Sequence, residues 1–499
     1  MAKHTALAGP GTIEKLADWV LAPSAEAIPE AALTQAKLLL LDTIGCGYAA
    51  REEESARAVL ATWAEIGGAP QCSVIGSAQK TSAPNAVLVN GALIRILDLN
   101  DYVNNPKGEI GGHPSDNIPV ALAAGELAGA SGREMIAAIV LGYEVFGRSR
   151  DLMTRDSGWD GVTISGLVAP AIAGRLMRLD PQRLAHALAL SAARAPTPLA
   201  VRHGAISAAK SLANALVAQN GMQAAILARH GVTGPLDLFE NPLGLAPVFS
   251  RTEAVAPLTA PLGAETYIMR ANIKAYPCLA TGQAIVAAGI ALHAQVATAL
   301  DGNLERLRRI RVTMADMPFL RRQKDDPGRI DPTSREAADH SFNFLAAVAL
   351  LDGEFGLAQF ENERWNDPKV RAVMARLDIA VDAGLNARSP GSFPCRMAAT
   401  TDDGRAYAVE IPDPPGFSRH GLDVNAVTRK FNAVTAPHLD QRARERIIDA
   451  VMVLDRSSSC AGVTQALAAA SARVRSAQRT LRSRPSAASM MRARPGASR

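Results

Sequence analysis

Apolar positions recur at helical spacing through the first half of the chain. From residue 13 to about residue 230, apolar side chains return every three or four positions, which predicts a succession of amphipathic or buried helices. Pro29 stands at the predicted start of a long helix and Gly231 at the predicted end of the last one, with a short β-like run at 72–76 between. The predicted helices cover residues 12–22, 29–50, 54–67, 82–101, 115–130, 132–151, 162–180, 180–194 and 207–231.

The periodicity changes near residue 270. Residues 307–315 alternate apolar and polar side chains, which is typical of a half-buried strand, and residues 395–411 predict a hairpin that turns at Asp403–Gly404. Helical periodicity then returns. The predicted fold is mainly α, with a large all-α helical domain formed by both chain ends and an inserted, smaller α+β domain. The predicted divisions are 1–269 (helical), 270–421 (α+β), 422–455 (helical) and 456–499 (tail).

The positive net charge of the chain comes from its C-terminal segment. The 499 residues carry 53 Lys and Arg against 48 Asp and Glu, a formal net charge of +5. Residues 456–499 contain nine Arg and no acidic residue, so the remainder has a net charge of +5 − 9 = −4. The basic excess belongs to a Ser-, Ala- and Arg-rich segment that we expect to be disordered. No specific nucleic-acid partner is therefore expected.

The sequence predicts neither a membrane span nor a disulfide framework. Apolar runs of transmembrane length are interrupted by Gly, Pro or charge, and the first 20 residues lack the apolar core of a secretory signal. The five cysteines are far apart, odd in number and without a CxxC pair. This pattern favours a reducing, cytoplasmic location and no membrane partner.

The common cofactor and metal motifs are missing from the sequence. It contains no GxGxxG after a strand, no GxxxxGK[ST] and no GxSxG. Its nine histidines show neither HxH nor HxxxH spacing, which zinc sites often use. We therefore expect no metal centre and no bound cofactor.

The strongest chemical signal lies in residues 96–117. An apolar helical run delivers Asp98 and Asp101, a Gly-rich loop follows, and His113 stands just before a new helix. A carboxylate, an imidazole and a helix N-terminus in one connection suit proton transfer beside a carboxylate-bearing substrate. The alternative is structural, with the two Asp capping a helix end and a turn, and His113 an ordinary loop residue.

Asp160 and Lys210 are further candidates. Asp160 follows Trp159 just before an Ala-rich helix, where a capping Asp beside a packed Trp is the structural alternative. Lys210 lies among Ala and Ser on a helix expected to be buried, where an ammonium is costly unless it is paired. A lysine that reaches out to solvent is its alternative. Arg202, just upstream, adds positive potential.

Two later segments contribute Lys274 and His340. Lys274 precedes a Pro-Cys turn, and His340 lies between Asp339 and Ser341 at the start of an apolar helix. Asp339 or Ser341 as a helix cap is the simplest interpretation there. His340 either faces a cleft or packs in the interior.

Five segments in order resemble the MmgE/PrpD family, which includes 2-methylcitrate dehydratase and cis-aconitate decarboxylase. The most specific segment, LDLNDYVNNPKGEIGGHPSDN, resembles the family motif LDFNDT…HPSDN. The Trp-Asp pair at 159–160 resembles the dehydratase form, since the decarboxylase branch has a His there. The five segments span residues 39–50, 97–126, 157–180, 208–235 and 335–356.

The resemblance implies a homodimer, an α+β lid on the helical domain, and metal-free lyase or isomerase chemistry on di- or tricarboxylates. Asp98 and His113 fall on the motif residues, Tyr102 falls where a threonine often stands, and Lys210 falls on the helix lysine. We therefore predict catalytic roles for Asp98, His113, Lys210 and Asp160. Predicted substrate-binding residues are Tyr102, Arg202, Lys274 and His340.

Some positions depart from the family pattern. Phe344 stands where the decarboxylases use a tyrosine, and residues 279–283 lack a histidine found in some relatives. These departures concern substrate identity more than fold, and they argue against cis-aconitate decarboxylase.

The sequence therefore predicts a dehydratase of a small hydroxy di- or tricarboxylate such as 2-methylcitrate. In this hypothesis Lys210, helped by Lys274, stabilises the aci-carboxylate, while His113 serves as acid or base with Asp98 as its partner. Asp160 is a second candidate for proton transfer, and the sequence leaves open which group is acid and which is base. The alternatives are an epimerase or isomerase, a decarboxylase of a related polycarboxylate, and a non-catalytic carboxylate-binding protein.

Overall fold

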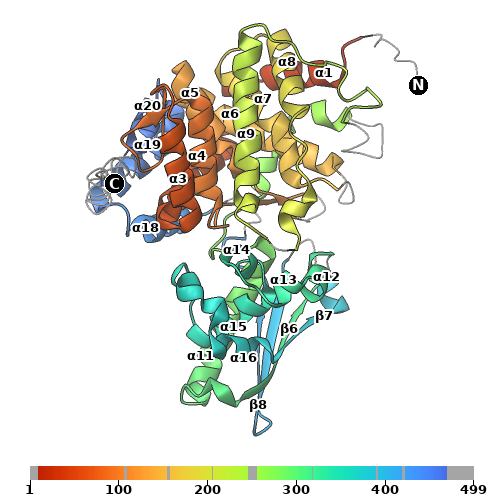
Figure 1. Ribbon diagram of the computed structural model, residues 1–499, viewed down its shortest axis with the longest axis vertical. Helices are drawn as coiled ribbons and strands as arrows, with labels where there is room; N and C mark the ends of the chain where they lie inside the picture. The colour runs from red at the N-terminus through yellow and green to blue at the C-terminus, as the bar shows by residue number, and fades with distance from the viewer. Residues whose placement is uncertain are drawn as a thin grey trace, which may run out of the picture.

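The structure is a computed structural model, mainly helical with small mixed sheets (Figure 1). The residues that it describes are 9–105, 110–153, 158–204, 206–245, 256–263, 265–316, 318–388, 392–417 and 422–468.

The predicted helices of the first half are confirmed, with shifts of at most four residues at their ends in all but one case. The helix predicted over 82–101 ends at Arg95, so Asp98 and Asp101 lie beyond it. Pro29 directly precedes α2, where its missing N–H costs no hydrogen bond. Ser131 and Glu134 form a capping box at the start of α6, which fixes where this helix begins. The helices are α1 (Thr12–Leu21), α2 (Glu30–Ala49), α3 (Glu54–Ile66), α4 (Ala83–Arg95), α5 (Ile118–Ala128), α6 (Gly132–Leu152), α7 (Ser165–Leu176), α8 (Pro181–Ala192) and α9 (Ala209–Arg229).

A four-stranded mixed sheet forms in the second half. Its order is β7-β6-β8-β9, with β6 parallel to β7 and antiparallel to β8. The predicted hairpin is confirmed, because Thr400 pairs with Ala406 across the turn at Asp403–Gly404. In β6 the side chains of Ile310, Val312 and Met314 are buried, as the alternation predicted. The strands are β6 (Leu307–Met314), β7 (Leu377–Val381), β8 (Cys395–Thr401) and β9 (Ala406–Ile411).

Helices cover one side of this sheet. Helix α11 contacts β8, β9 and α15. It lies within Ala280–Ala299, the only helical stretch among the described residues that is long and apolar enough to cross a membrane. However, 67% of its apolar window is buried inside the protein. The burial identifies it as a core helix. The helices here are α11 (Gln283–Ala299), α12 (Pro318–Asp325), α13 (Pro327–Ile330), α14 (Arg335–Ala338), α15 (Phe342–Asp352), α16 (Pro368–Met374) and α17 (Ala383–Asn386).

The protein has two large apolar cores, and the residues of the second lie between the two sequence segments that form the first. The first joins side chains from Ile13–Ile273 with side chains from Val427–Leu467, so α18 (Val424–Thr435) and α19 (Gln441–Met452) pack with the N-terminal helices. The second lies within Cys278–Ala399. Figure 1 shows the corresponding helical body above the smaller α+β part. The exact domain boundaries stay predictions.

Two short sheets brace the connections of the helical body. Strand β1 (Cys72–Ser73) lies in the predicted β-like run and pairs with β2 (Lys80–Thr81), which lies outside it. Strand β3 (Tyr102–Asn104) lies between β4 (Ile110–Gly112) and β5 (Ala271–Asn272). Because β5 comes just before Lys274, this sheet brings the start of the second half beside the loop that follows α4.

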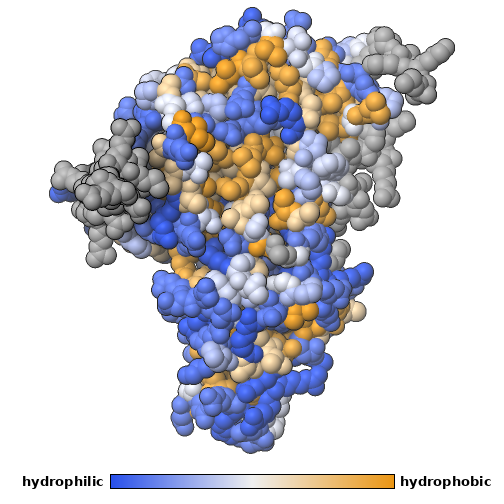
Figure 2. Space-filling view, viewed as in Figure 1, coloured by the Kyte–Doolittle hydropathy of each residue, from blue (hydrophilic) through white to orange (hydrophobic). Residues whose placement is uncertain are grey.

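The surface differs between the two parts. In Figure 2 apolar side chains gather over the helical body near α7 and α9, whereas the α+β part is mostly hydrophilic on this face. Leu216 and Leu227 of α9 are 52% and 42% exposed. Helix α9 therefore buries one face against α4, α7 and α8 and presents an apolar outer face.

The expectation of disorder from residue 456 is wrong for residues 456–468. Helix α20 (Ala461–Ala466) packs in the first core through Val463 and Leu467. The Leu467 carbonyl accepts hydrogen bonds from the Tyr48 hydroxyl at 2.7 Å and from the Gly76 amide at 2.7 Å. The Ala- and Ser-rich composition concealed these few apolar anchors. Residues 469–499, which carry the other predicted disorder, lie outside the described residues.

We predict that Leu467→Ala lowers the free energy of unfolding by about 3 kcal/mol, because it leaves a cavity in a packed core. The matched control is Leu243→Ala, since Leu243 is 97% exposed and its truncation is expected to change stability by less than about 0.5 kcal/mol. Thermal or denaturant unfolding measures both. Equal, small effects would show that the segment is not part of the core.

Candidate active site

The candidate site begins where α4 ends. After Arg95 the chain leaves the helix, and Asp98 adopts a φ of +50°, a left-handed conformation that a short Asp side chain tolerates better than most residues. The Asp98 amide still donates to the Arg95 carbonyl at 3.1 Å. This turn directs the Asp98 carboxylate into the interior, where it is 1% exposed.

Three cations surround the Asp98 carboxylate. Arg95, one turn earlier, and Lys274 both form short ion pairs with it, and the Lys210 ammonium lies 3.7 Å away. Lys274 also donates to the Asp98 carbonyl at 2.9 Å. Burial alone raises the pKa of Asp98, but Arg95, Lys274 and Lys210 outweigh it and hold that pKa well below its usual value. Asp98 is therefore ionised at neutral pH.

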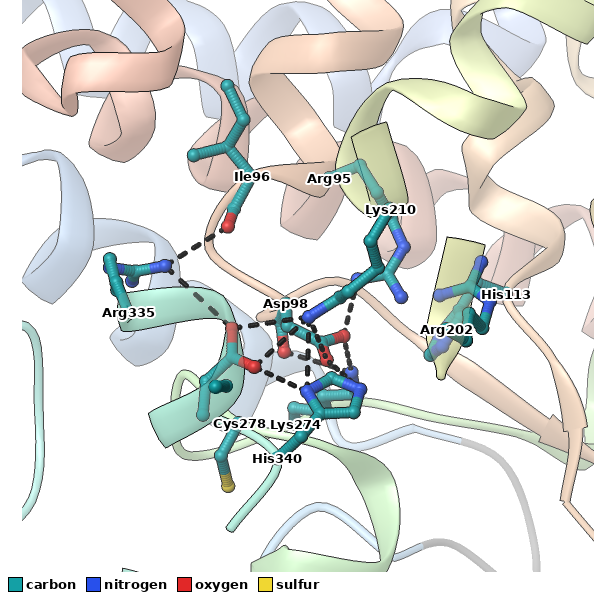
Figure 3. A network of polar contacts seen from close by, with 12 residues as sticks. Arg95, Ile96, Asp98, His113, Arg202, Lys210, Lys274, Cys278, Arg335 and His340 are labelled. Atoms are coloured by element: carbon teal, nitrogen blue, oxygen red, sulfur yellow. Dashed lines mark hydrogen bonds and ion pairs between the residues drawn. The ribbon is translucent and has the colours of Figure 1, made fainter. Parts of the chain in front are cut away.

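Lys210 is buried and paired. Its ammonium donates to Asp339 at 3.0 Å and lies 3.1 Å from His340 Nδ1, while His340 Nδ1 also makes a short contact with Asp339. Burial lowers the pKa of Lys210, and Asp339 and Asp98 oppose that shift only in part. Figure 3 shows Lys210, Lys274 and His340 converging on Asp98 from three different segments.

Ser341, not Asp339, caps α15. The Ser341 hydroxyl accepts from the Phe344 amide at 3.2 Å, which leaves Asp339 free to pair with Lys210. Burial and the nearby Lys210 lower the pKa of His340 to about 4, so this imidazole is neutral at pH 7. Of the two caps that the sequence allowed, Ser341 is the one that forms, and Asp339 is not a cap.

Asp98, Asp339 and His340 could also be read as a metal triad, since one ligand atom from each lies within 4.8 Å of the others. The Lys210 ammonium already lies 3.0 Å from Asp339, 3.1 Å from His340 Nδ1 and 3.7 Å from Asp98. A second cation in the same place would be repelled by Lys210 and Lys274. The donor set therefore suits an ammonium better than a metal ion.

His113 is not held by Asp98, contrary to the sequence hypothesis. Its Nδ1 lies 2.6 Å from the carbonyl oxygen of Asp101. Because a carbonyl can only accept, Nδ1 carries the proton and Nε2 keeps a free lone pair. Desolvation, Arg95 and Lys274 lower the pKa of His113 well below its usual value, so the ring is neutral at pH 7, with its lone pair on Nε2.

Asp101 anchors the same loop from behind. Its carboxylate accepts from the Tyr143 hydroxyl at 2.7 Å and from the Ser115 amide at 3.3 Å. Burial raises the pKa of Asp101 to about 7, despite these two hydrogen bonds. Asp101 thus holds His113 through its carbonyl and Ser115 through its carboxylate. In the sequence, the signal for Asp101 was its place three residues after Asp98.

Asp160 holds Arg202. One carboxylate oxygen accepts from the Val162 amide at 3.0 Å and caps the turn before α7, and the other forms a short ion pair with Arg202 Nε. With both oxygens engaged, Asp160 is better placed to orient Arg202 than to carry a proton. Figure 3 draws Arg202 on the same side of the cluster as His113.

Arg95 and Asp116 connect these groups, and neither was a predicted site residue. Arg95 Nε lies 3.6 Å from an Asp116 oxygen, and Asn100 donates to the other Asp116 oxygen at 2.7 Å. Burial raises the pKa of Asp116, and the positive charges of Arg95 and Arg202 oppose that shift. The available signal for Arg95 was a cation at the end of an apolar run, three residues before Asp98.

The start of the helix after His113 differs from expectation. Residues Pro114–Asn117 form a 3-10 turn, and α5 begins only at Ile118. Ser115 and Asp116, expected as N-terminal residues of a helix, instead accept hydrogen bonds from Asn100.

Four of the eight predicted site residues meet in one cluster: Asp98, Lys210, Lys274 and His340. Tyr102 is buried at the start of β3, and no hydrogen bond or ion pair between described residues joins it to that cluster. Asp160 and Arg202 form a separate ion pair, and His113 binds the Asp101 carbonyl. Whether these residues bind or transform a substrate stays a prediction.

Comparison with known proteins places the chain among enzymes of one family. The MmgE/PrpD N-terminal domain matches residues 14–257 and the MmgE/PrpD C-terminal domain matches residues 276–456. Cis-aconitate decarboxylase of Aspergillus terreus is 26% identical over 482 residues, covering 89% of this chain and 94% of the relative. The human cis-aconitate decarboxylase is 24% identical, covering 87% and 90%. The 2-methylcitrate dehydratase of Salmonella typhimurium is 25% identical, covering 89% and 94%.

We predict that Asp101→Asn gains stability relative to the wild type as the pH rises from about 4 to about 7. The folded pKa of Asp101 is raised to about 7, whereas an unfolded Asp titrates near 3.9. In this window the folded state keeps a proton that the unfolded state loses, so rising pH destabilises the wild type, by on the order of a few kcal/mol. Melting temperatures of both proteins across pH 4.5–8 measure this, and a pH-independent gap would contradict it.

Proposed function

The chain belongs to the MmgE/PrpD family, and we propose that it is a lyase that dehydrates a small hydroxy di- or tricarboxylate such as 2-methylcitrate. The observation that supports this most is the buried cluster of Arg95, Lys210 and Lys274 around two ionised carboxylates. Three fixed cations beside a neutral imidazole are what proton abstraction next to a carboxylate requires.

The cations stabilise the charge that develops on the substrate. Removing a proton from the carbon next to a carboxylate spreads negative charge onto the carboxylate oxygens. Lys274 donates twice to Asp98, so its third N–H is available to a substrate oxygen. Arg202 binds Asp160 through Nε alone, and its two terminal nitrogens have no partner among the described residues. We assign substrate carboxylate binding to these two side chains.

His113 is the proposed base. The hydrogen bond from Nδ1 to the Asp101 carbonyl leaves Nε2 as the acceptor, and the lowered pKa keeps it unprotonated at neutral pH. Lys210, whose pKa burial lowers, is the proposed donor of the proton that leaves with the hydroxyl group. The substrate hydroxyl leaves as water with the proton that Lys210 gives it. His113 then releases the proton that it removed to solvent and Lys210 takes one up, so the net change is the loss of one water.

A decarboxylase of a related tricarboxylate is the second candidate, because relatives of that name match the chain as fully as the dehydratases do. The same cations would stabilise the carbanion left when carbon dioxide departs. Phe344, whose missing hydroxyl argued against this activity, is buried in the second core with its ring 5.6 Å from Phe360. Its identity therefore carries less weight against a decarboxylase than the sequence suggested.

We predict that the wild type forms a double bond from 2-methylcitrate or a related hydroxy tricarboxylate, measured as rising absorbance near 240 nm. His113→Asn is the matched variant, because its side-chain amide can still donate to the Asp101 carbonyl but offers no base at Nε2. Turnover in this variant is expected to fall by ~10²–10⁴-fold with little change in melting temperature.

Other products in the same screen separate the alternatives. Carbon dioxide release from cis-aconitate would replace the dehydratase by the decarboxylase. Deuterium uptake from solvent without loss of water would indicate an epimerase. Tight carboxylate binding without any turnover would contradict the enzyme proposal altogether.

We further predict that Lys210→Met both inactivates and destabilises the protein, the latter by about 3 kcal/mol, because it removes the cation closest to the buried Asp339 carboxylate and leaves Arg335, 3.8 Å away, as its remaining cationic partner among the described residues. Adding Asp339→Asn removes that poorly compensated charge, so the double variant should regain most of that stability but not the activity. Unfolding measurements and turnover assays on both variants test this. Activity that returns with stability would assign Lys210 a purely structural role.

A further inference from the structure

The segment that carries Asp98 is held from outside by cations of the second half of the chain. Beyond α4 the carbonyls have no intrahelical partner, as at any helix C-terminus. Arg335 donates to the Ile96 carbonyl at 3.2 Å, Lys274 to the Asp98 carbonyl at 2.9 Å and Lys430 to the Leu99 carbonyl at 2.8 Å. Two of these cations also touch charged groups of the candidate site, and Lys430 does not.

Lys430 reaches this position because α18 packs closely on α2. A Cβ at Gly45 of α2 would lie 3.0 Å from the Phe431 ring, so the glycine permits the close approach. One turn before Gly45, Asp42 is 2% exposed, and its carboxylate lies 2.6 Å from the Lys430 ammonium. Asp42 therefore fixes the ammonium on the Leu99 carbonyl.

The two carbonyls bound by Lys274 and Lys430 belong to consecutive peptides directly after Asp98. The peptide group between Asp98 and Leu99 follows directly on the left-handed Asp98 residue, with its φ of +50°. Lys274 donates a hydrogen bond to the Asp98 carbonyl, and Lys430 donates one to the Leu99 carbonyl. A shift here would move the carboxylate that Arg95, Lys210 and Lys274 share.

We propose that Lys430, held by Asp42, is a positioning residue for Asp98 and makes the activity of the site depend on the C-terminal helix α18. It acts through the Leu99 carbonyl and touches no substrate. The inference rests on the proposed function for its effect on turnover, but its effect on the backbone is independent of any activity.

The chain offers a closely matched control. Lys37 of α2 donates to Asp455 at 2.8 Å and to the Met452 carbonyl at 3.2 Å, so it also joins one carboxylate and one carbonyl across the first core. Its side chain is 12% exposed, against 10% for Lys430. The control pair makes no contact with the Asp98 segment.

The experiment compares Lys430→Met/Asp42→Asn with Lys37→Met/Asp455→Asn, each of which removes both charges of a pair. Amide hydrogen exchange of residues 98–103 is expected to speed up at least tenfold in the first variant and to stay at the wild-type rate in the second. On the substrate that the wild type turns over, kcat is expected to fall about ten- to hundredfold in the first variant and less than twofold in the second, since small misplacements of catalytic groups carry costs of this size.

Equal exchange in the two variants, or faster exchange with unchanged kcat, would overturn the proposal. If the wild type turns over no carboxylate, the proposed function fails, while the exchange measurement still decides the role of Lys430. If the double variant does not fold, Lys430→Arg keeps the charge beside Asp42 with a different shape. A several-fold lower kcat at an unchanged melting temperature then supports the proposal, and an unchanged kcat overturns it.

Discussion

Buried charge is the constraint on which this structure depends. Arg95, Lys210 and Lys274 lie almost wholly out of contact with solvent, and an unpaired buried ion is costly enough to unfold a protein of ordinary stability. Each must therefore meet a carboxylate: Asp98 and Asp339 are the nearest partners, and Asp116 lies 3.6 Å from Arg95. The pairs join residues up to 176 positions apart, so satisfying the charges also fixes how distant segments of the chain lie.

The location of the cluster follows from the two cores. Asp98 follows α4 and Lys210 lies in α9, both helices of the first core, while Asp339 and His340 precede α15 of the second. A substrate carboxylate that enters between these groups must compete with ion pairs already made. Such a site holds its donors in place before the substrate arrives, which is the arrangement that stabilises developing charge most effectively.

The helices and the hairpin could be predicted from the sequence, because helical periodicity and the turn at Asp403–Gly404 are local signals. Asp98, His113 and Lys210 were identified as candidates from residue type and setting. The pairings were not, since Asp98 pairs with Lys274 and His113 with the Asp101 carbonyl, across a left-handed residue that no sequence pattern marks. Asp339 looked like a helix cap because its real partner, Lys210, lies 129 residues earlier. Helix α20 was concealed by a composition in which only a few apolar residues anchor it.

The most direct test of the central claim is a crystal structure with a bound, unreactive tricarboxylate. We expect a ligand carboxylate within about 3 Å of Lys274 Nζ or the terminal nitrogens of Arg202, with the reacting carbon facing His113 Nε2. A ligand bound elsewhere, with the Asp98 cluster untouched and His113 turned away from it, would contradict the account.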